Sequence, residues 1–324
     1  MEGIRIEACL LFYLFFCNNI QYFFYFDLLY KYHFFMKEFN KIINIFNKTI
    51  QNIKCIHNEH IRRKIKEEDY FRIYLKFLHN FTYFSRFEYI FNNNIITGKY
   101  LNEKVNFWNK NKIFETMFTS IITEYIKNTN KNNFKYLSID SQFIINKQMF
   151  KNKVGRNVQY KSKNGLRISA IVDIHGIPLI NSINRGNDHD SKFLIEMMQK
   201  LFLMNINTTI FKEKKKSKIT ILGDSAYDTA NIRKFIKDNN MNAIIDYNNR
   251  NTQDLNKIKK LKNKEEEKYK ERNIIENSHA WKEMKIPRMG KIYDKKYINY
   301  VGMNYLAIID LILNRNLITL KNLN

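Results

Sequence analysis

The chain contains little proline and glycine, with two and nine residues respectively among 324. Disordered chains are usually rich in such residues and poor in aromatic ones, whereas aromatic residues make up 15% of this sequence. An ordered globular protein is therefore expected. A chain of 324 residues can bury a full core, and two domains are expected, one of them small.

Cysteine is also scarce, and the three residues Cys9, Cys17 and Cys55 all lie in the first sixth of the chain. No histidine-rich or paired spacing surrounds them. This arrangement excludes a disulfide framework and a cysteine zinc site, and it fits a reducing compartment.

The chain has no apolar run long enough to span a bilayer, which takes about 20 residues. The longest candidate, Ala8 to Cys17, has ten residues. A signal peptide is disfavoured because Glu2 and Glu7 flank Arg5 and no small-residue cleavage site follows. The run is better explained as a buried helix, or as residues upstream of a true start at Met36.

Acidic residues are outnumbered, with 31 Asp and Glu against 55 Lys and Arg, which gives a net charge of +24. The sequence pI is about 9.7. Such a charge attracts phosphate backbones, so nucleic acid is the leading partner. The alternative is codon bias, because the abundance of Ile, Asn, Lys, Phe and Tyr is typical of an AT-rich genome.

Apolar residues recur at helical spacing in the first part of the chain. The segments concerned are 36–56, 69–82, 85–97 and 114–125. We expect a helical N-terminal region over residues 1–130, in which the role of residues 1–35 is uncertain. This region could bind DNA ends through a helix-turn-helix, although a bundle that only packs on the next domain is an equally good interpretation.

After residue 134 the pattern changes to alternating strands and helices. Strands are expected at 136–140, 166–173, 177–184, 219–224 and 243–245, and helices from 190, from 229, around Glu276 and over 298–320. This order is that of a ribonuclease H-like mixed sheet flanked by helices, in which the first and fourth strands are neighbours. We assign this α/β fold to residues 131–324.

Three acidic residues stand where that fold would bring them together. Asp140 and Asp224 close the first and fourth apolar runs, and Glu276 lies in the charged helical segment. Carboxylate oxygens are the ligands that Mg²⁺ and Mn²⁺ prefer, and phosphoryl transfer uses two such ions roughly 3.5–4 Å apart. Taken singly, each aspartate is better explained by a strand that ends at the surface, and it is the three acids together, in this topology, that favour a metal site.

The helical segment carries a sharper pattern, because Tyr269, Arg272 and Glu276 share one face of an α-helix. An exposed helix with an ordinary Arg–Glu pair would give the same spacing. The pattern nevertheless resembles the Tyr-x-x-Arg-x-x-x-Glu signature of a branch of DDE transposases of bacterial-type insertion sequences. Further motifs that match in order are Ile139-Asp140-Ser141, Gly155-Arg156-Asn157, Lys163-Asn164-Gly165-Leu166-Arg167, Gly176-Ile177-Pro178-Leu179, Asn187-Asp188-His189-Asp190-Ser191 and Gly223-Asp224-Ser225-Ala226-Tyr227-Asp228.

The resemblance implies an enzyme that cuts phosphodiester bonds at element ends and joins 3′-hydroxyls to target DNA. Two Mg²⁺ or Mn²⁺ ions would be the cofactors, double-stranded DNA the substrate, and a homodimer the synaptic assembly, inside the cell with the DNA. By this resemblance Asp140, Asp224 and Glu276 bind metal and catalyse. Tyr269, Arg272, Lys282, Arg156 and Lys163 are the DNA-binding candidates.

The chain departs from the signature at one position. A lysine is expected seven residues after Glu276, but Glu283 stands there and Lys282 comes one residue early. One residue turns a side chain about 100° around a helix, so the DNA contact of Lys282 is in question. Only some 25 residues separate the last strand from Tyr269, so a hairpin mechanism that needs a large insert there is not supported.

Two other functions remain open on sequence grounds. One is a stand-alone nuclease of the same fold, and the other is a transposase-derived protein that binds DNA without cutting it. Outside the triad, His189 is a candidate DNA contact, while Asp190 or Ser191 is more simply the cap of the following helix.

Overall fold

The computed structural model describes residues 40–51, 65–80, 84–91, 94–147, 153–204, 219–249 and 260–315. The chain divides into two compact units, residues 1–42 and 43–324. The account below concerns the second unit. The apolar run 8–17 and the lysine-rich run 212–218 lie outside the described residues.

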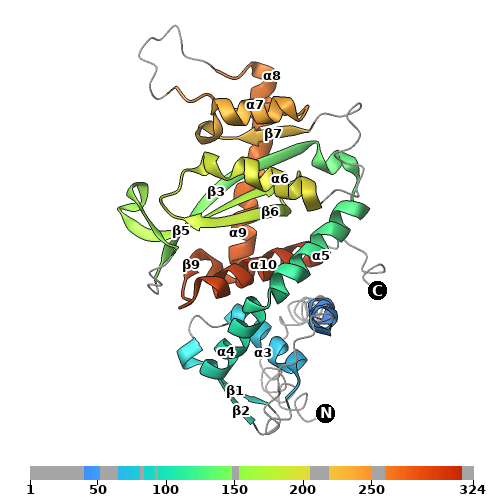
Figure 1. Ribbon diagram of the computed structural model, residues 1–324, viewed down its shortest axis with the longest axis vertical. Helices are drawn as coiled ribbons and strands as arrows, with labels where there is room; N and C mark the ends of the chain where they lie inside the picture. The colour runs from blue at the N-terminus through green and yellow to red at the C-terminus, as the bar shows by residue number, and fades with distance from the viewer. Residues whose placement is uncertain are drawn as a thin grey trace, which may run out of the picture. The chain divides into compact units, whose positions relative to one another are not determined.

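The centre of the second unit is a mixed seven-stranded sheet (Figure 1). Its strands are β3 (Tyr136–Asn146), β4 (Gly155–Asn157), β5 (Lys163–Val172), β6 (Pro178–Arg185), β7 (Thr220–Gly223), β8 (Asn242–Ile245) and β9 (Lys291–Ile292). The main order is β6-β5-β3-β7-β8, with β5 antiparallel to β3 and β6, and β7 parallel to β3 and β8. This is the ribonuclease H-like order, and it confirms the predicted neighbours β3 and β7.

Helices cover the sheet, and their apolar residues form its core. The helices are α6 (Leu194–Met204), α7 (Ala230–Asp238), α8 (Asn263–Tyr269), α9 (Ile274–Lys285) and α10 (Tyr297–Asn314). α6 packs on β6 and α7, whereas α9 packs on β3 and β5 and is itself covered by α10. The strands and helices expected after residue 134 are all present, with β4 and β9 in addition. Residues 316–320 of the helix expected over 298–320 lie outside the described residues.

Short 3-10 turns connect these elements. They are η1 (Phe84–Arg86), η2 (Lys131–Phe134), η3 (Val158–Tyr160), η4 (Asp190–Lys192), η5 (Ser225–Tyr227), η7 (Lys270–Asn273) and η8 (Pro287–Gly290). The β5–β6 turn lies at His175-Gly176, as predicted. Gly176 has φ of +72°, a conformation that costs glycine little, and Asp173 accepts the backbone N–H groups of His175 and Ile177.

The segments before residue 130 are mainly helical: residues 40–51, α3 (Glu67–Asn80), α4 (Gly98–Lys110) and α5 (Ile113–Asn128). The helix predicted over 85–97 is wrong. Those residues form a hairpin of β1 (Glu88–Phe91) and β2 (Asn94–Thr97). Ile96 is buried while its neighbour Ile95 is exposed, which is the two-residue period of a strand.

An aromatic cluster joins these helices. The rings of Phe46 and Phe71 stack with centroids 4.0 Å apart, and the buried Trp108 packs edge-on against both. α10 packs on α4 and α5, so within the second unit the helices and the sheet share one core. The predicted boundary near residue 130 stays a prediction. In the described residues, no helix is long and apolar enough to cross a membrane.

Candidate active site

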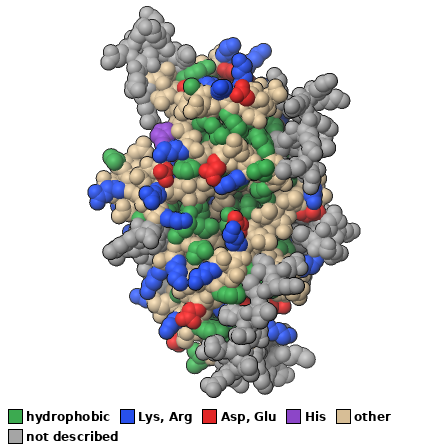
Figure 2. Space-filling model, viewed as in Figure 1, with side chains coloured by type: hydrophobic (Ala, Val, Ile, Leu, Met, Phe, Trp, Pro, Cys, Tyr) green, Lys and Arg blue, Asp and Glu red, His purple; other side chains and the backbone are tan. Residues whose placement is uncertain are grey.

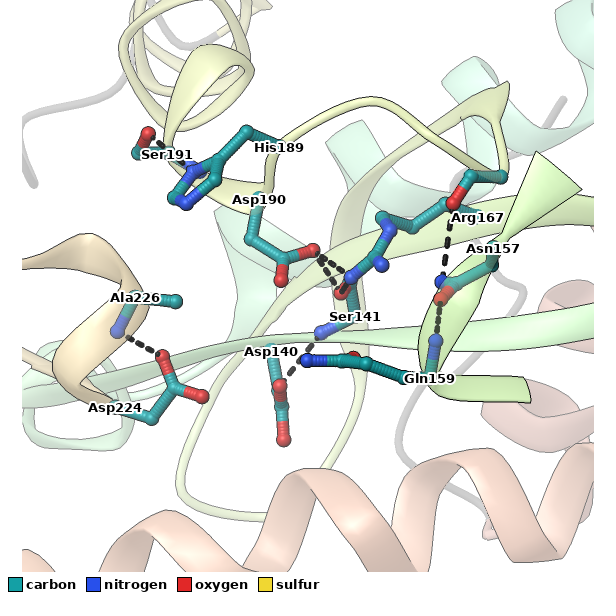
Figure 3. Close-up of polar contacts among 11 residues, drawn as sticks. Asp140, Ser141, Asn157, Gln159, Arg167, His189, Asp190, Ser191, Asp224 and Ala226 are labelled. Atoms are coloured by element: carbon teal, nitrogen blue, oxygen red, sulfur yellow. Dashed lines mark hydrogen bonds and ion pairs between the residues drawn. The ribbon is translucent and has the colours of Figure 1, made fainter. Parts of the chain in front are cut away.

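Two aspartates lie side by side where β7 ends. Ser138 of β3 and Leu222 of β7 form the last pair of their parallel ladder. Asp140 and Asp224 each stand two residues beyond this pair, and Asp224 keeps an extended backbone. Equal advance along parallel strands brings them level and onto one face, with the strands about 4.8 Å apart. Figure 3 shows their carboxylates facing a common space.

Asp140 lies within β3 rather than at its end, contrary to the sequence prediction. β3 continues to Asn146, but its pairing with β7 stops at Ser138, so the strand edge beside Asp140 is open to other groups. Ala170, which pairs with Asp140 across the β3–β5 ladder, packs against Ile275 of α9. Asp140 therefore faces the side of the sheet that α9 covers.

The environment of Asp140 disfavours its charge. Burial raises the pKa of this carboxyl, and the neighbouring Asp224 charge adds to the effect. The Ser141 N–H, which donates to Asp140 Oδ1 at 2.7 Å, and the Arg272 guanidinium act in the opposite direction. A cation in this space would therefore stabilise the ionised pair.

Asp224 is fixed by its place before a 3-10 turn. Its Oδ1 accepts the backbone N–H of Ala226 at 2.9 Å, as a helix-capping aspartate does. The cap leaves the other carboxylate oxygen of Asp224 without a partner in the described part of the chain.

The signature residues do not lie on one continuous α-helix. Tyr269 ends α8, Arg272 lies in the 3-10 turn η7, and Glu276 lies in the first turn of α9. Residues three apart nearly eclipse one another in a 3-10 turn, and the Arg272 guanidinium lies over the Tyr269 ring at 5.6 Å. A 3-10 segment inside a helix is often a functional hinge.

Arg272 joins the helix to the strand. Its Nη1 donates to Asp140 Oδ2 at 2.9 Å, and its Nη2 donates to Glu276 Oε1 at 3.4 Å. One guanidinium thus bridges the two carboxylates and acts as a stand-in cation between them. The Arg272 side chain is 15% exposed, whereas that of Glu276 is 62% exposed.

The described residues contain no group of three or more His, Cys, Asp or Glu arranged to hold a metal ion. The donor chemistry nevertheless suits a hard divalent cation, because the carboxylates of Asp140 and Asp224 face a common space (Figure 3) and the Arg272 guanidinium already lies between Asp140 and Glu276.

Lys282 is not placed to contact DNA. Its side chain is buried, with 2% exposed, and among the described residues its Nζ has no hydrogen-bond partner. Burial lowers the pKa of Lys282 to about 8. Glu283, at the position where the signature has lysine, accepts a hydrogen bond from Gln142 of β3 instead. Lys282 comes one residue before the signature position, and at that position its side chain lies in the core.

Arg156 and Lys163 lie on an exposed hairpin formed by β4, η3 and the start of β5. They occupy adjacent rungs, Arg156 opposite Asn164 and Lys163 opposite Asn157, so the two basic side chains leave opposite faces of the hairpin. Lys and Arg side chains gather at the left edge of Figure 2, where Figure 1 draws this hairpin. Val158, near its tip, is 81% exposed.

The segment after β6 contains functional candidates that sequence reasoning missed. His189, rather than Asp190 or Ser191, caps η4, because its ring accepts the Ser191 N–H. Asp190 instead pairs with Arg167 of β5 at 2.5 Å and accepts a hydrogen bond from Ser141 (Figure 3). The matched motifs that contain Arg167 and Asp190 were the available signal, but nothing in them shows that these two residues, 23 apart in the sequence, form a pair.

Comparison with known proteins agrees with this geometry. The family described as "Transposase DDE domain" matches residues 135–292, which span the sheet and the Glu276 helix. No curated protein sequence matches the chain. A crystal structure of the catalytic domain of Mos1 mariner transposase is similar at 8% identity and a TM-score of 0.26, covering 63% of this chain and 91% of that one.

A TM-score of 0.26 is too low to support an argument, so the fold assignment rests on the strand order and the family match. That match starts one residue before β3 and ends with β9, and it contains Asp140, Asp224 and Glu276. The chain therefore carries the DDE domain of a transposase over residues 135–292, in a ribonuclease H-like fold.

Proposed function

We propose that this transposase cuts phosphodiester bonds at the ends of a DNA element and joins the freed 3′-hydroxyls to target DNA, with Asp140, Asp224 and Glu276 as the catalytic carboxylates. The observation that supports this is the Arg272 bridge from Asp140 to Glu276, beside Asp224. It brings strand and helix carboxylates to one place around a positive charge. Because two ends must be processed together, a homodimer is the expected assembly.

Transposases of this family generally act with divalent metal ions, and we assign two Mg²⁺ or Mn²⁺ ions to the three carboxylates. Such ions supply Lewis acidity, which activates the attacking oxygen and stabilises the leaving oxygen. Asp140 and Asp224 would hold an ion from the sheet, and Glu276 from the helix. Arg272 would have to leave Glu276 or Asp140 as these ligands turned to the metal.

The remaining groups would bind and orient the DNA. A guanidinium released from the carboxylates can pair with the scissile phosphate through two N–H groups. Burial raises the pKa of Tyr269, against the opposing charge of Arg272, so its neutral hydroxyl can donate to a phosphate oxygen.

The bond changes balance in both steps. In cutting, a water oxygen bonds to phosphorus and gives up a proton, the bond from phosphorus to the 3′-oxygen breaks, and that oxygen takes up a proton. In joining, the 3′-oxygen bonds to a target phosphorus, its proton is released, and the target's own 3′-oxygen leaves and is protonated.

The proposed activity is tested on a supercoiled plasmid that carries the DNA flanking this gene. We expect nicking and strand joining by the wild-type protein with Mn²⁺, and none with EDTA. Asp224→Asn keeps the cap to Ala226 but removes the charge, so it should lower nicking about 1000-fold. Asp238→Asn, an exposed change on α7, is the matched control.

Each outcome separates the candidate functions. Nicking without joined product would support a stand-alone nuclease. Tight DNA binding without metal-dependent nicking would support a protein that only binds DNA. Equal nicking by the wild type and Asp224→Asn would remove Asp224 from the catalytic set.

The hairpin is the proposed sequence-independent DNA contact. The double change Arg156→Gln with Lys163→Gln should weaken DNA binding and reduce the slope of log affinity against log salt by about 2, because two phosphate contacts would be lost. Fluorescence anisotropy across a salt series measures this slope. Lys234→Gln with Lys237→Gln, two exposed residues of α7, should leave the slope unchanged. An equal decrease of the slope in both double variants would show that the effect comes from net charge alone.

A further inference from the structure

A chain of polar contacts crosses the sheet to reach Asp140. Arg167 pairs with Asp190 at 2.5 Å, and Ser141 donates its hydroxyl hydrogen to the same Asp190 oxygen. The Ser141 backbone N–H in turn donates to Asp140 at 2.7 Å. Figure 3 shows these side chains linked in that order.

The contacts come from both faces of β3. Neighbouring residues on a strand point to opposite faces, so Ser141 points away from the α9 side that Asp140 faces. Arg167 shares the face of Ser141, because it pairs with Phe143 two residues along the ladder. Asp190 therefore contacts β3 on the face opposite to α9, next to the proposed catalytic residue Asp140.

Over the described part of the sheet, one edge of β3 lacks strand pairing between Ser138 and Ile145, in the part that carries Asp140. Pairing with β7 stops at Ser138, and pairing with β9 starts only at Ile145. Between them β3 pairs with β5 along one edge, and no described strand covers the other. Side-chain contacts must therefore supply the order that a second ladder would give.

The ion pair is well shielded, with side-chain exposures of 13% for Arg167 and 19% for Asp190. Arg167 also donates to the Ser141 hydroxyl oxygen at 3.1 Å, so Ser141 is held by both members of the pair. A hydrogen bond to a charged partner is stronger than one between neutral groups. The position of Ser141 is thus fixed by two charge-assisted bonds.

Asp190 lies near the turn that follows Asp224, because its own turn η4 packs against η5, which carries Tyr227. The ring of Tyr227 is buried, and in the described structure its hydroxyl has no hydrogen-bond partner. Burial raises the pKa of Tyr227, and the charges of Asp190, Asp140 and Asp224 raise it further. One buried hydroxyl is thus within electrostatic reach of all three carboxylates.

We propose that Asp190 is a positioning residue, which acts through Ser141 to hold the Asp140 carboxylate in the orientation that binds metal. The inference rests on the proposed function, because it assigns a metal to Asp140. Loss of a residue that orients a metal ligand typically weakens metal affinity about 10- to 100-fold.

The test compares Ser141→Ala with Ser141→Thr in the full chain. The alanine variant removes the hydroxyl and leaves the Arg167–Asp190 pair intact, whereas threonine keeps the hydroxyl. Mn²⁺ binding is measured by electron paramagnetic resonance, which needs no activity, and folding by the urea midpoint. We expect the Mn²⁺ Kd to rise about tenfold in Ser141→Ala and to return towards the wild-type value in Ser141→Thr.

Asp190 is tested in the same way. Asp190→Ala should match Ser141→Ala, and the double variant should be no worse than either, because both break one chain of contacts. Asp190→Asn keeps an oxygen for Ser141 and should lose less. Asp188→Asn, which removes the same charge from the same segment without touching Ser141, is the matched control.

The outcomes separate this inference from the proposed function. An unchanged Mn²⁺ Kd in Ser141→Ala would overturn the positioning role, and so would an equal effect of Asp188→Asn. A wild type that binds no Mn²⁺ would overturn it as well. If Ser141→Ala weakens Mn²⁺ binding but the wild type nicks no DNA, the positioning role stands and the proposed function fails.

Discussion

Glu276→Gln is expected to lower Mn²⁺-dependent nicking about 1000-fold while DNA binding stays intact. The amide keeps the shape of the side chain but removes the charge that a divalent ion needs. Metal ions contribute several kcal/mol to such transition states, and each 1.4 kcal/mol is about tenfold in rate. Nicking of plasmid DNA gives the rate, and anisotropy gives the affinity.

Folding should survive this change. The Glu276 side chain is 62% exposed and its contact with Arg272 is 3.4 Å long, and exposed ion pairs contribute about 0–1 kcal/mol. Glu271→Gln is the matched control, because it makes the same chemical change at an exposed position of η7. Equal nicking by the wild type and Glu276→Gln would remove Glu276 from the site. Equal losses in both variants would show a general charge effect.

The second large effect is expected in stability, from Lys282→Met. The Lys282 ammonium lies in the core with the buried, neutral His279 in the same helix, and burial lowers the pKa of Lys282 from its ordinary value of 10.5 to about 8. One pKa unit is worth about 1.4 kcal/mol, so the buried charge costs about 3 kcal/mol at pH 7. Methionine has a similar length and no charge, so the variant should gain about this amount.

The sign of the pH dependence follows from proton uptake. Between pH 8 and 10.5 the unfolded chain keeps a proton on Lys282 that the folded chain has released, so the wild type gains stability as pH rises. The advantage of Lys282→Met should be complete below pH 8 and should disappear above 10.5. Urea unfolding across this range measures it.

A constant advantage at every pH would contradict this account and assign the gain to apolar packing. DNA affinity gives an independent check. Because Lys282 is a core residue, Lys282→Met should bind DNA as tightly as the wild type does. Weaker DNA binding by Lys282→Met would instead show that Lys282 contacts DNA, as the lysine of the family signature is expected to do.

The positions of the main strands along the chain were predictable because each is an apolar run bounded by polar residues, and burial in the core requires that pattern. Their order in the sheet came from the likeness of this succession to the ribonuclease H-like fold. The hairpin at 88–97 was not, since short apolar runs fit a helix or a strand equally well. In this segment the pairing between the two strands, for example of Tyr89 with Ile96, selects the strand conformation. β9 has two residues, too few for a sequence pattern, and it is recognised as a strand by its pairing with β3.

The candidate carboxylates Asp140 and Asp224 could be named from the sequence because each closes an apolar run, and the two runs belong to strands that the fold makes neighbours. The sequence spacing also placed Arg272 with Glu276. It did not place Arg272 against Asp140, 132 residues away, nor the 3-10 turn that turns Arg272 towards the strand. Contacts at such a distance depend on how α9 lies on the sheet.

The sequence by itself determined the fold class and the succession of strands and helices after residue 134, because local periodicity encodes them. It also offered Asp140, Asp224 and Glu276 as the proposed catalytic residues. Only the tertiary structure decided which charges are exposed. It buried Lys282, left Glu276 in solvent and brought Asp190 behind Asp140 through Ser141. Burial and ion pairing are properties of groups that meet across the fold, and no local pattern specifies which groups will meet.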